Sequence, residues 1–395
     1  MLLQTNASYA SFPWTMPTVE PMPLENELRG MTREGELYEK LPNDRVRCFA
    51  CGHRCLILDG QAGVCRVRFN RDGTLHVPSG YAGVLQFDPI EKKPFFHAHP
   101  GTNAFSFGML GCDFHCGYCQ NWVTSQTLRD PAAGVDPKRL TAEEMVALAK
   151  RYGASTLAST YNEPLITSEW AVEIFKLAKA AGIHTAYISN GNATPEVLDY
   201  LLPWLELYKV DLKSFNDANY RKLGGKLDNV LQSIQQIHQK GLWLEIVTLI
   251  VPGFNDSDEE LGNIAHFLAD ISGDIPWHVT AFHQDYKMRD RENTAVATLM
   301  RAANLGREAG LRFVYAGNLP GQVGHFENTH CPDCSTLLVK RSGYRILAYN
   351  MRAGACPQCQ RTIPGRWPKD DVVPLAASQP RPIQALRYDR ARPQT

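Results

Sequence analysis

The sequence carries no excess charge of either sign, because 41 Lys and Arg residues balance 41 Asp and Glu residues. A chain without a basic excess lacks the electrostatic signature of a nucleic-acid-binding protein. The sequence also lacks an N-terminal basic segment followed by an apolar run, and it has no stretch of about 18 apolar residues that could span a membrane. We therefore expect a cytoplasmic protein with no nucleic-acid partner and no membrane partner.

No cysteine stands outside three groups, although the chain of 395 residues has 11 of them. In a compartment that keeps thiols reduced, such groups indicate metal sites rather than disulfides. The groups are Cys48, Cys51, Cys55 and Cys65, then Cys112, Cys116 and Cys119, and finally Cys331, Cys334, Cys356 and Cys359.

The middle group has the spacing Cys-x3-Cys-x2-Cys within one short segment. A structural zinc site needs a fourth ligand, and none follows at a matching spacing. Three thiolates suit a [4Fe–4S] cluster with one iron left open, where a small molecule can bind. The alternatives are a loop of buried thiols, or a zinc site with one distant ligand.

The two outer groups each offer four thiolates. Cys48–Cys65 spans 18 residues and suits either zinc or a second [4Fe–4S] cluster. The sequence leaves this choice open, and we favour zinc because no electron path is visible in it. At the C-terminal end, two Cys-x2-Cys pairs are separated by 21 residues, which is close to zinc-ribbon spacing. We expect structural zinc there, with a rubredoxin-like iron site as the alternative.

Residues 140–316 alternate between expected strands and helices, which predicts an α/β fold with a parallel sheet. Thr141 and Glu144 form a capping box for one helix, and Gly153 ends it. Polar residues follow the ends of successive strands, and parallel strands end at one edge of a sheet. One shared site is therefore predicted from Asn162, Glu163, Asn190, Asp211, Lys213 and His283.

The cysteine loop, with Tyr118 before its last cysteine, resembles the signature of the radical SAM enzymes. That resemblance implies a partial (β/α)6 TIM-type barrel and an open iron that binds S-adenosylmethionine. Tyr161–Pro164 resembles the family's Gly-Gly-Glu element, which implies that Glu163 binds the amino group of S-adenosylmethionine. By the same resemblance, cofactor contacts are implied for Tyr118, Asn162, Ser189, Asn190, Asp211, Lys213 and His283. Asn162 departs from the family's glycine, and a solvated ion pair is the alternative for Asp211 and Lys213.

Further segments are similar to relatives of pyruvate formate-lyase activating enzyme and to the radical SAM member of the AmmeMemoRadiSam system. They are Asp88–Pro94, Trp277–His283 and Ile363–Trp367. The domain organisation expected from the sequence is an extended or disordered arm (1–34), a four-cysteine metal-binding β region (35–100), a radical SAM partial barrel (101–320), a zinc ribbon (321–368) and a flexible tail (369–395).

The resemblance implies an enzyme that cleaves S-adenosylmethionine reductively to a 5′-deoxyadenosyl radical, which abstracts hydrogen from an unidentified substrate. Ferredoxin or flavodoxin is the expected electron donor. A protein substrate, such as a glycyl radical enzyme, is expected by analogy with activating enzymes. One alternative is a small-molecule substrate. The other is a protein without radical chemistry, either a scaffold stabilised by metal ions or an electron carrier.

Overall fold

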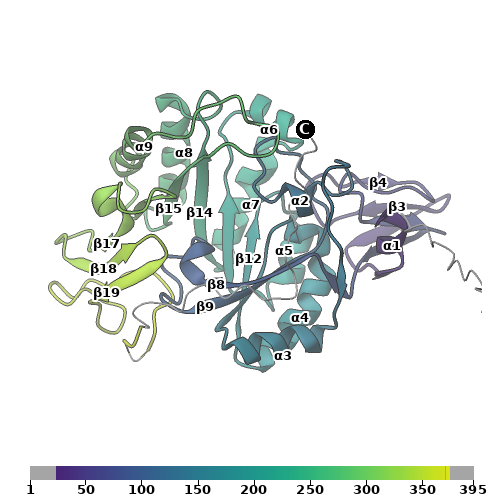
Figure 1. Ribbon diagram of the computed structural model, residues 1–395, viewed down its shortest axis with the longest axis horizontal. Helices are drawn as coiled ribbons and strands as arrows, with labels where there is room; N and C mark the ends of the chain where they lie inside the picture. The colour runs from purple at the N-terminus through teal and green to yellow at the C-terminus, as the bar shows by residue number, and fades with distance from the viewer. Residues whose placement is uncertain (1–23, 370, 374–395) are drawn as a thin grey trace, which may run out of the picture.

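The protein is described here by a computed structural model that covers residues 24–369 and 371–373. Three parts follow one another along its longest axis: a small β region, a central α/β part and a three-stranded sheet (Figure 1). Residues 24–34, which we expected in an extended arm, instead form α1 (Leu24–Arg29) and β1 (Thr32–Glu34). They are ordered because Leu28 and Met31 are buried in the core. The remainder of the predicted arm and most of the predicted tail lie outside the described residues.

The central part contains an eight-stranded sheet in the order β16-β15-β14-β13-β12-β11-β9-β8. Every neighbouring pair is parallel except β8 and β9, which are antiparallel. The strands are β8 (Val84–Pro89), β9 (Asn103–Gly108), β11 (Thr156–Ser159), β12 (His184–Ser189), β13 (Leu207–Asp211), β14 (Trp243–Ile250), β15 (Trp277–Ala281) and β16 (Val314–Gly317). The predicted α/β fold of strand–helix repeats in an open, partial barrel is confirmed.

Helices connect the parallel strands: α2 (Trp122–Ser125), α3 (Ala142–Tyr152), α4 (Ser168–Ala180), α5 (Pro195–Leu201), α6 (Asp217–Leu223), α7 (Leu227–Gln239), α8 (Asp258–Ile271) and α9 (Val296–Glu308). The predicted capping box of Thr141 and Glu144 opens α3, and Gly153 ends it with a φ of 69°. Helix α6 was not expected from the sequence. It begins at Asn216, whose side chain accepts hydrogen bonds from the backbone N–H groups of Ala218 and Asn219.

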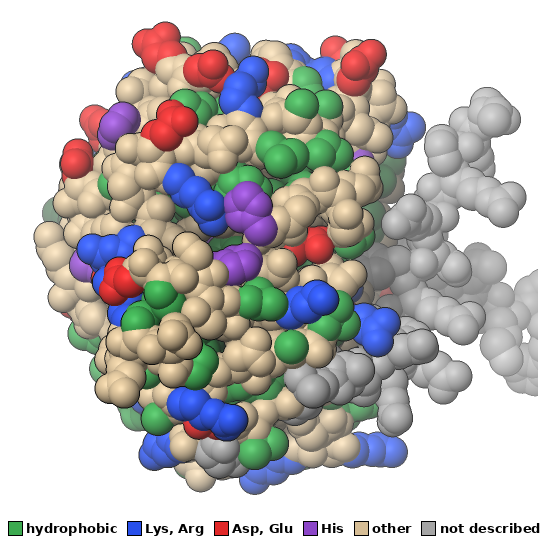
Figure 2. Space-filling view, turned by 90° about the vertical axis from the view of Figure 1, so that its left-hand side faces the viewer, with side chains coloured by type: hydrophobic (Ala, Val, Ile, Leu, Met, Phe, Trp, Pro, Cys, Tyr) green, Lys and Arg blue, Asp and Glu red, His purple; other side chains and the backbone are tan. Residues whose placement is uncertain are grey.

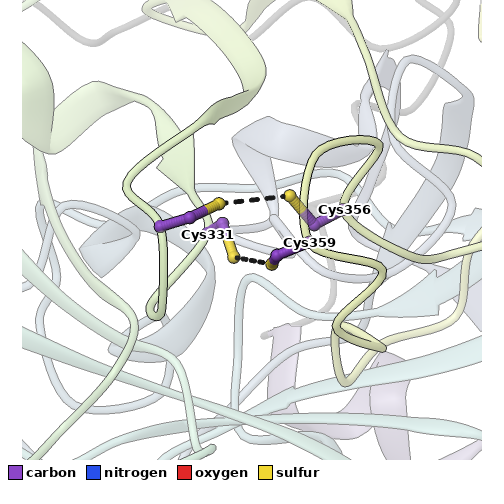
Figure 3. A group of neighbouring side chains, drawn as sticks. Cys331, Cys356 and Cys359 are labelled. Carbon is purple, nitrogen blue, oxygen red and sulfur yellow. Dashed lines mark hydrogen bonds between the residues drawn. The ribbon is translucent and has the colours of Figure 1, made fainter.

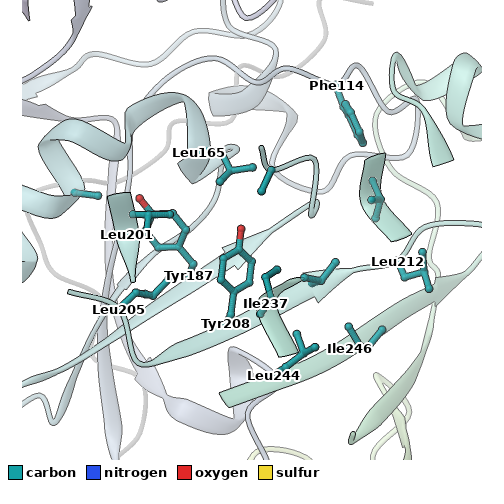
Figure 4. Close-up of a cluster of buried hydrophobic side chains, with 14 of the residues drawn as sticks. Phe114, Leu165, Tyr187, Leu201, Leu205, Tyr208, Leu212, Ile237, Leu244 and Ile246 are labelled. Carbon is teal, nitrogen blue, oxygen red and sulfur yellow. The ribbon is translucent and has the colours of Figure 1, made fainter. Parts of the chain in front are cut away.

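The core lies between the sheet and these helices, as the buried cluster in Figure 4 shows. Tyr187 of β12 and Tyr208 of β13 are fully buried, with ring centroids 5.9 Å apart. Aliphatic side chains from α5, α7 and β14 surround them, among them Leu201, Ile237 and Leu244. Burying each such side chain contributes about 1.5–3 kcal/mol, so this layer holds the strand ends at fixed positions.

The N-terminal region consists of two small antiparallel sheets. One contains β2 (Tyr38–Leu41), β3 (Arg45–Cys48) and β4 (Leu56–Ile57), and the other β1, β5 (Phe69–Arg71) and β6 (Thr74–Pro78). A two-stranded pair, β7 (Tyr81–Ala82) with β10 (Lys138–Arg139), lies between this region and the sheet. Arg68 and Glu169 join the region to α4 through two hydrogen bonds of 2.7 Å, with side chains 1% and 0% exposed.

The C-terminal sheet contains β17 (Thr329–His330), β18 (Leu337–Ser342) and β19 (Arg345–Tyr349). It packs on a hydrophobic cluster that joins Leu338, Ile346 and Ile363 to Phe313 and Tyr315 of the central part. Figure 2 shows this end of the molecule, where Lys and Arg side chains are interspersed with acidic and histidine side chains. Within the described part of the chain, no helix has the length and apolar character needed to cross a membrane.

Candidate functional site

A cavity of about 100 Å³ at the C-terminal edge of the sheet brings the predicted site residues together. Its walls include all three cysteines of the middle group, together with Asn162, Glu163, Asn190, Asp211 and Lys213. A larger cavity of about 370 Å³ shares Cys116, Cys119, Asp211 and Lys213 with it. The site therefore has a small compartment at the cysteines and a wider one beside it.

The cysteine loop follows β9 and is fixed at its start by a close backbone approach. Gly111 has a φ of 88°, and a Cβ built on it would lie 3.0 Å from the carbonyl oxygen of Cys65. Both the left-handed backbone and the lack of space require glycine here. The buried Asp113 then accepts hydrogen bonds from the amide groups of Asn190 (2.7 Å) and Asn192 (2.9 Å). The loop is thus anchored to the turn that follows β12.

Glu163 is oriented by three hydrogen bonds before any ligand binds. Its carboxylate accepts from the Ser189 hydroxyl at 2.7 Å, and from the backbone N–H groups of Asn190 at 2.7 Å and Leu165 at 3.1 Å. Burial, reinforced by the nearby Asp113 carboxylate, raises the pKa of Glu163 to about 8. A cationic ligand next to this group would stabilise its ionised form.

Asp211 lies between two lysines. Its carboxylate is 2.6 Å from Nζ of Lys209 and 3.9 Å from Nζ of Lys213. Burial opposes the charge on Asp211, but the two lysines outweigh this effect and hold its pKa below the usual range. The nearest partner of Asp211 is therefore Lys209, and the Lys213 ammonium faces the cysteine cavity.

The other predicted residues take different positions. Tyr118 is buried and lines the wider cavity. The Asn162 amide oxygen accepts from the backbone N–H of Met109 at 3.1 Å, and so holds the start of the cysteine loop. His283 is exposed at the rim, where its Nε2 lies 3.0 Å from the side-chain nitrogen of Gln120, next to Cys119.

A polar cluster in the wider cavity was not predicted from the sequence. The Lys93 ammonium donates to the Tyr161 hydroxyl at 2.6 Å and to Asp88 at 3.1 Å. His278 also lines this cavity, and its Nε2 is 2.7 Å from Glu245.

Tyr161 has a φ of 68°, which is unusual for a residue with a side chain. The charged motif Asp88–Pro94 was visible in the sequence, but its place in the cavity depends on the antiparallel pairing of β8.

Distances between thiol sulfurs distinguish the metal sites that each cysteine group fits. Around one tetrahedral zinc, with Zn–S bonds of about 2.3 Å, sulfurs lie about 3.8 Å apart. Among the described residues, two groups place ligand atoms of at least three side chains within 4.8 Å of one another: the four C-terminal cysteines, and His99 with His184 and Glu206. The middle cysteines do not form such a compact group. Their wider spacing fits a cluster in which each thiolate binds a separate iron.

The four C-terminal cysteines form a ready-made site for one metal ion (Figure 3). The sulfurs of Cys331 and Cys359 are 3.4 Å apart, and those of Cys334 and Cys356 are 3.5 Å apart. Four converging thiolates leave no open position on a tetrahedral ion, so a metal here stabilises the fold.

Comparisons with known proteins agree with this geometry. A family model described as Radical SAM superfamily matches residues 108–268. An uncharacterised protein of Methanocaldococcus jannaschii is 37% identical over 336 residues, covering 84% of this chain and 98% of its own length. Pyruvate formate-lyase-activating enzyme of Clostridium pasteurianum is 30% identical over 216 residues, covering 49% of this chain and 85% of its own length.

Two further proteins show lower identity to this chain. Pyruvate formate-lyase 1-activating enzyme of Escherichia coli is 24% identical over 237 residues, covering 55% of this chain and 93% of its own length. The crystal structure of a radical SAM methyltransferase from Sphaerobacter thermophilus superposes with a TM-score of 0.43 and 15% identity, covering 81% of this chain and 86% of that one. That structural likeness is too distant to add to the argument.

Proposed function

Because this chain belongs to the radical SAM superfamily, we propose which of its residues carry the chemistry and which class of substrate it acts on. It is an enzyme that binds a [4Fe–4S] cluster and S-adenosylmethionine and cleaves the latter to a radical. When bound, the cluster supplies the electron for that cleavage. We assign the cluster to Cys112, Cys116 and Cys119, and this rests on one observation: their cavity also contains Glu163, Asn190, Asp211 and Lys213.

The polar residues of that cavity match the charges of S-adenosylmethionine. Glu163 receives the amino group, since a buried carboxylate stabilises an ammonium by a charge-assisted hydrogen bond. Ser189 does not line the cavity, and it acts by holding Glu163 in position. The Lys213 ammonium receives the methionine carboxylate, while Lys209 neutralises Asp211. The remaining part of S-adenosylmethionine is bordered by Tyr118, Asn190 and His283. Asn162 holds the start of the cysteine loop in position.

We further propose a protein substrate, as in the activating enzymes that this chain resembles, with a small molecule as the alternative. A cavity of about 370 Å³ beside the cysteines accommodates one side chain or a short loop of a partner. The C-terminal cysteines hold zinc, and ferredoxin or flavodoxin supplies the electron. The cytoplasmic location and the membership in the AmmeMemoRadiSam subgroup also remain proposals.

The assignment is tested by measuring 5′-deoxyadenosine formed from S-adenosylmethionine and dithionite under anaerobic conditions. Cys116→Ala should abolish the product because the cluster loses a ligand. Cys334→Ala is the matched control, since it removes a thiol at the other end of the molecule and should leave product formation detectable. Deoxyadenosine formation by Cys116→Ala at the wild-type rate would refute the assignment.

The substrate class is tested with extract from cells grown in deuterated medium. The extract is divided by ultrafiltration, and each fraction is incubated with the enzyme. Deuterium in the deoxyadenosine from the retained macromolecules supports a protein substrate. Deuterium that comes solely from the filtrate contradicts it and identifies a small molecule.

A further inference from the structure

We propose that Cys48, Cys51, Cys55 and Cys65 hold a second [4Fe–4S] cluster, which passes electrons to the cluster at Cys112, Cys116 and Cys119. The sequence alone favoured zinc for this group, and the distances and contacts of the folded chain favour iron. The electron-transfer step rests on the proposed function, whereas the identity of the metal does not.

The N-terminal and C-terminal cysteine groups differ in the separation of their sulfurs. Among the described residues, the four N-terminal cysteines do not form a compact group with sulfurs within 4.8 Å of one another, whereas the four C-terminal cysteines do. Both groups have the same number of thiols. A tetrahedral zinc would draw the sulfurs to about 3.8 Å. Four thiolates on the separate irons of one cluster remain further apart.

The N-terminal cysteine group is in direct contact with the cysteine loop of the active site. The Cys65 carbonyl oxygen lies 3.0 Å from the position that a Cβ on Gly111 would occupy, next to Cys112. His53 Nε2 lies 3.2 Å from the Asp113 carbonyl oxygen. The backbone N–H of Gly52 donates at 2.8 Å to the carbonyl of Asn192, whose side chain in turn holds Asp113.

These contacts place the N-terminal cysteine group directly against the loop that carries the middle cysteines. Cys48, Cys55 and the middle cysteines also belong to one hydrophobic cluster. A buried path of this kind suits electron transfer, because little solvent reorganises when the charge moves. The C-terminal cysteines, by contrast, belong to a different hydrophobic cluster from the middle cysteines.

The outer side of the N-terminal cysteine group is accessible to a protein partner. Cys48, Cys51 and Cys65 are buried, but Cys55 is partly exposed. Leu56, Leu58 and Val64 are exposed next to it, and the Val64 backbone N–H is 3.5 Å from the Cys55 sulfur. Small apolar patches beside a redox centre suit the brief docking of an electron carrier. The occupant is therefore a one-electron carrier protein of the ferredoxin or flavodoxin class.

The electron count of this route is simple. The reduced carrier loses one electron at the Cys55 side, and the second cluster gains it. That cluster then returns to its oxidised form by reducing the cluster of the middle cysteines. No atoms move, and the carrier is the sole net reductant.

The metal is tested in the variant Cys112→Ala/Cys116→Ala/Cys119→Ala, purified anaerobically and reconstituted with iron and sulfide. About four irons per chain should remain, with a [4Fe–4S] EPR signal after reduction. Zinc in both outer groups and no iron would overturn the proposal. Because this variant lacks the catalytic ligands, the result is independent of whether the wild-type enzyme cleaves S-adenosylmethionine.

The electron route is tested by the ratio of deoxyadenosine formation with reduced flavodoxin to that with dithionite. Leu58→Asp places a charge beside Cys55 and should lower this ratio several-fold. Leu347→Asp is the matched control, because Leu347 is an exposed leucine of β19 in the C-terminal sheet, and its ratio should equal that of the wild type. Equal ratios in both variants would contradict electron entry beside Cys55.

Discussion

The two four-cysteine groups belong to the two small β regions that flank the central part (Figure 1), and they differ in the separation and the neighbours of their sulfurs. The C-terminal sulfurs converge, and Cys331 and Cys356 belong to a hydrophobic cluster distinct from the main core. The N-terminal sulfurs are spread, and Cys48 shares the main core with the active-site loop. The comparison teaches that the distances between sulfurs, and the neighbours they touch, decide the metal and its role.

The largest expected effect is that replacing one cysteine in each four-cysteine group removes a different metal. Cys51→Ala should lower the iron content by about four atoms per chain and leave zinc unchanged. Cys334→Ala should remove about one zinc and leave iron unchanged. Elemental analysis of both anaerobically purified variants measures this. Loss of zinc from both variants would show that both groups bind zinc, and this would contradict the prediction.

A second prediction compares the free energy of unfolding that one ion pair contributes at each end of the molecule. Arg68→Met leaves the buried Glu169 without its cation, and loss of one partner of a buried pair costs about 3–5 kcal/mol. Arg361→Met removes the partly exposed pair with Asp333 at the C-terminal end, which should cost less than about 1 kcal/mol. Denaturant unfolding measures both values, and similar losses would show that the N-terminal region is not held by Arg68.

The smallest predicted effect concerns the backbone contact between the N-terminal cysteine group and the loop of the middle cysteines. Gly111→Ala and Gly343→Ala both force alanine into a left-handed backbone, which costs about 1–2 kcal/mol. At Gly111 the new Cβ also meets the Cys65 carbonyl, whereas at Gly343 the nearest atom is Pro320 Cβ at 3.4 Å. Gly111→Ala should therefore unfold at lower denaturant and bind less iron. Identical behaviour of the two variants would contradict close packing of the loops.

Much of the central part followed from the sequence because its signals are local. The capping box of Thr141 and Glu144, and the apolar strands before Glu163 and Asp211, depend on residues near one another in the chain. Helix α6 was missed because its single strong signal, the cap residue Asn216, stands outside any clear apolar repeat. Residues 24–34 were misjudged because the burial of Leu28 and Met31 depends on the distant core that covers them.

The site was predictable where strand ends supply the residues, and less so where the chain folds back on itself. Glu163, Asn190 and Asp211 follow parallel strands, and the edge of the sheet brings them together. The contact of Lys93 with Tyr161 joins residues far apart in sequence through the pairing of β8 with β9. Likewise, cysteine spacing gives the number of ligands, whereas the distances between sulfurs arise from the folded turns.

The account is tested most directly by the EPR spectrum of the reduced wild-type protein, recorded with and without S-adenosylmethionine. One open cluster at the middle cysteines and one fully ligated cluster at the N-terminal cysteines predict two signals, of which a single one changes when S-adenosylmethionine is added. The same test on Cys116→Ala should leave a signal that does not respond. A wild-type spectrum that S-adenosylmethionine does not alter would contradict the assignment of the middle cysteines and favour a scaffold or electron carrier.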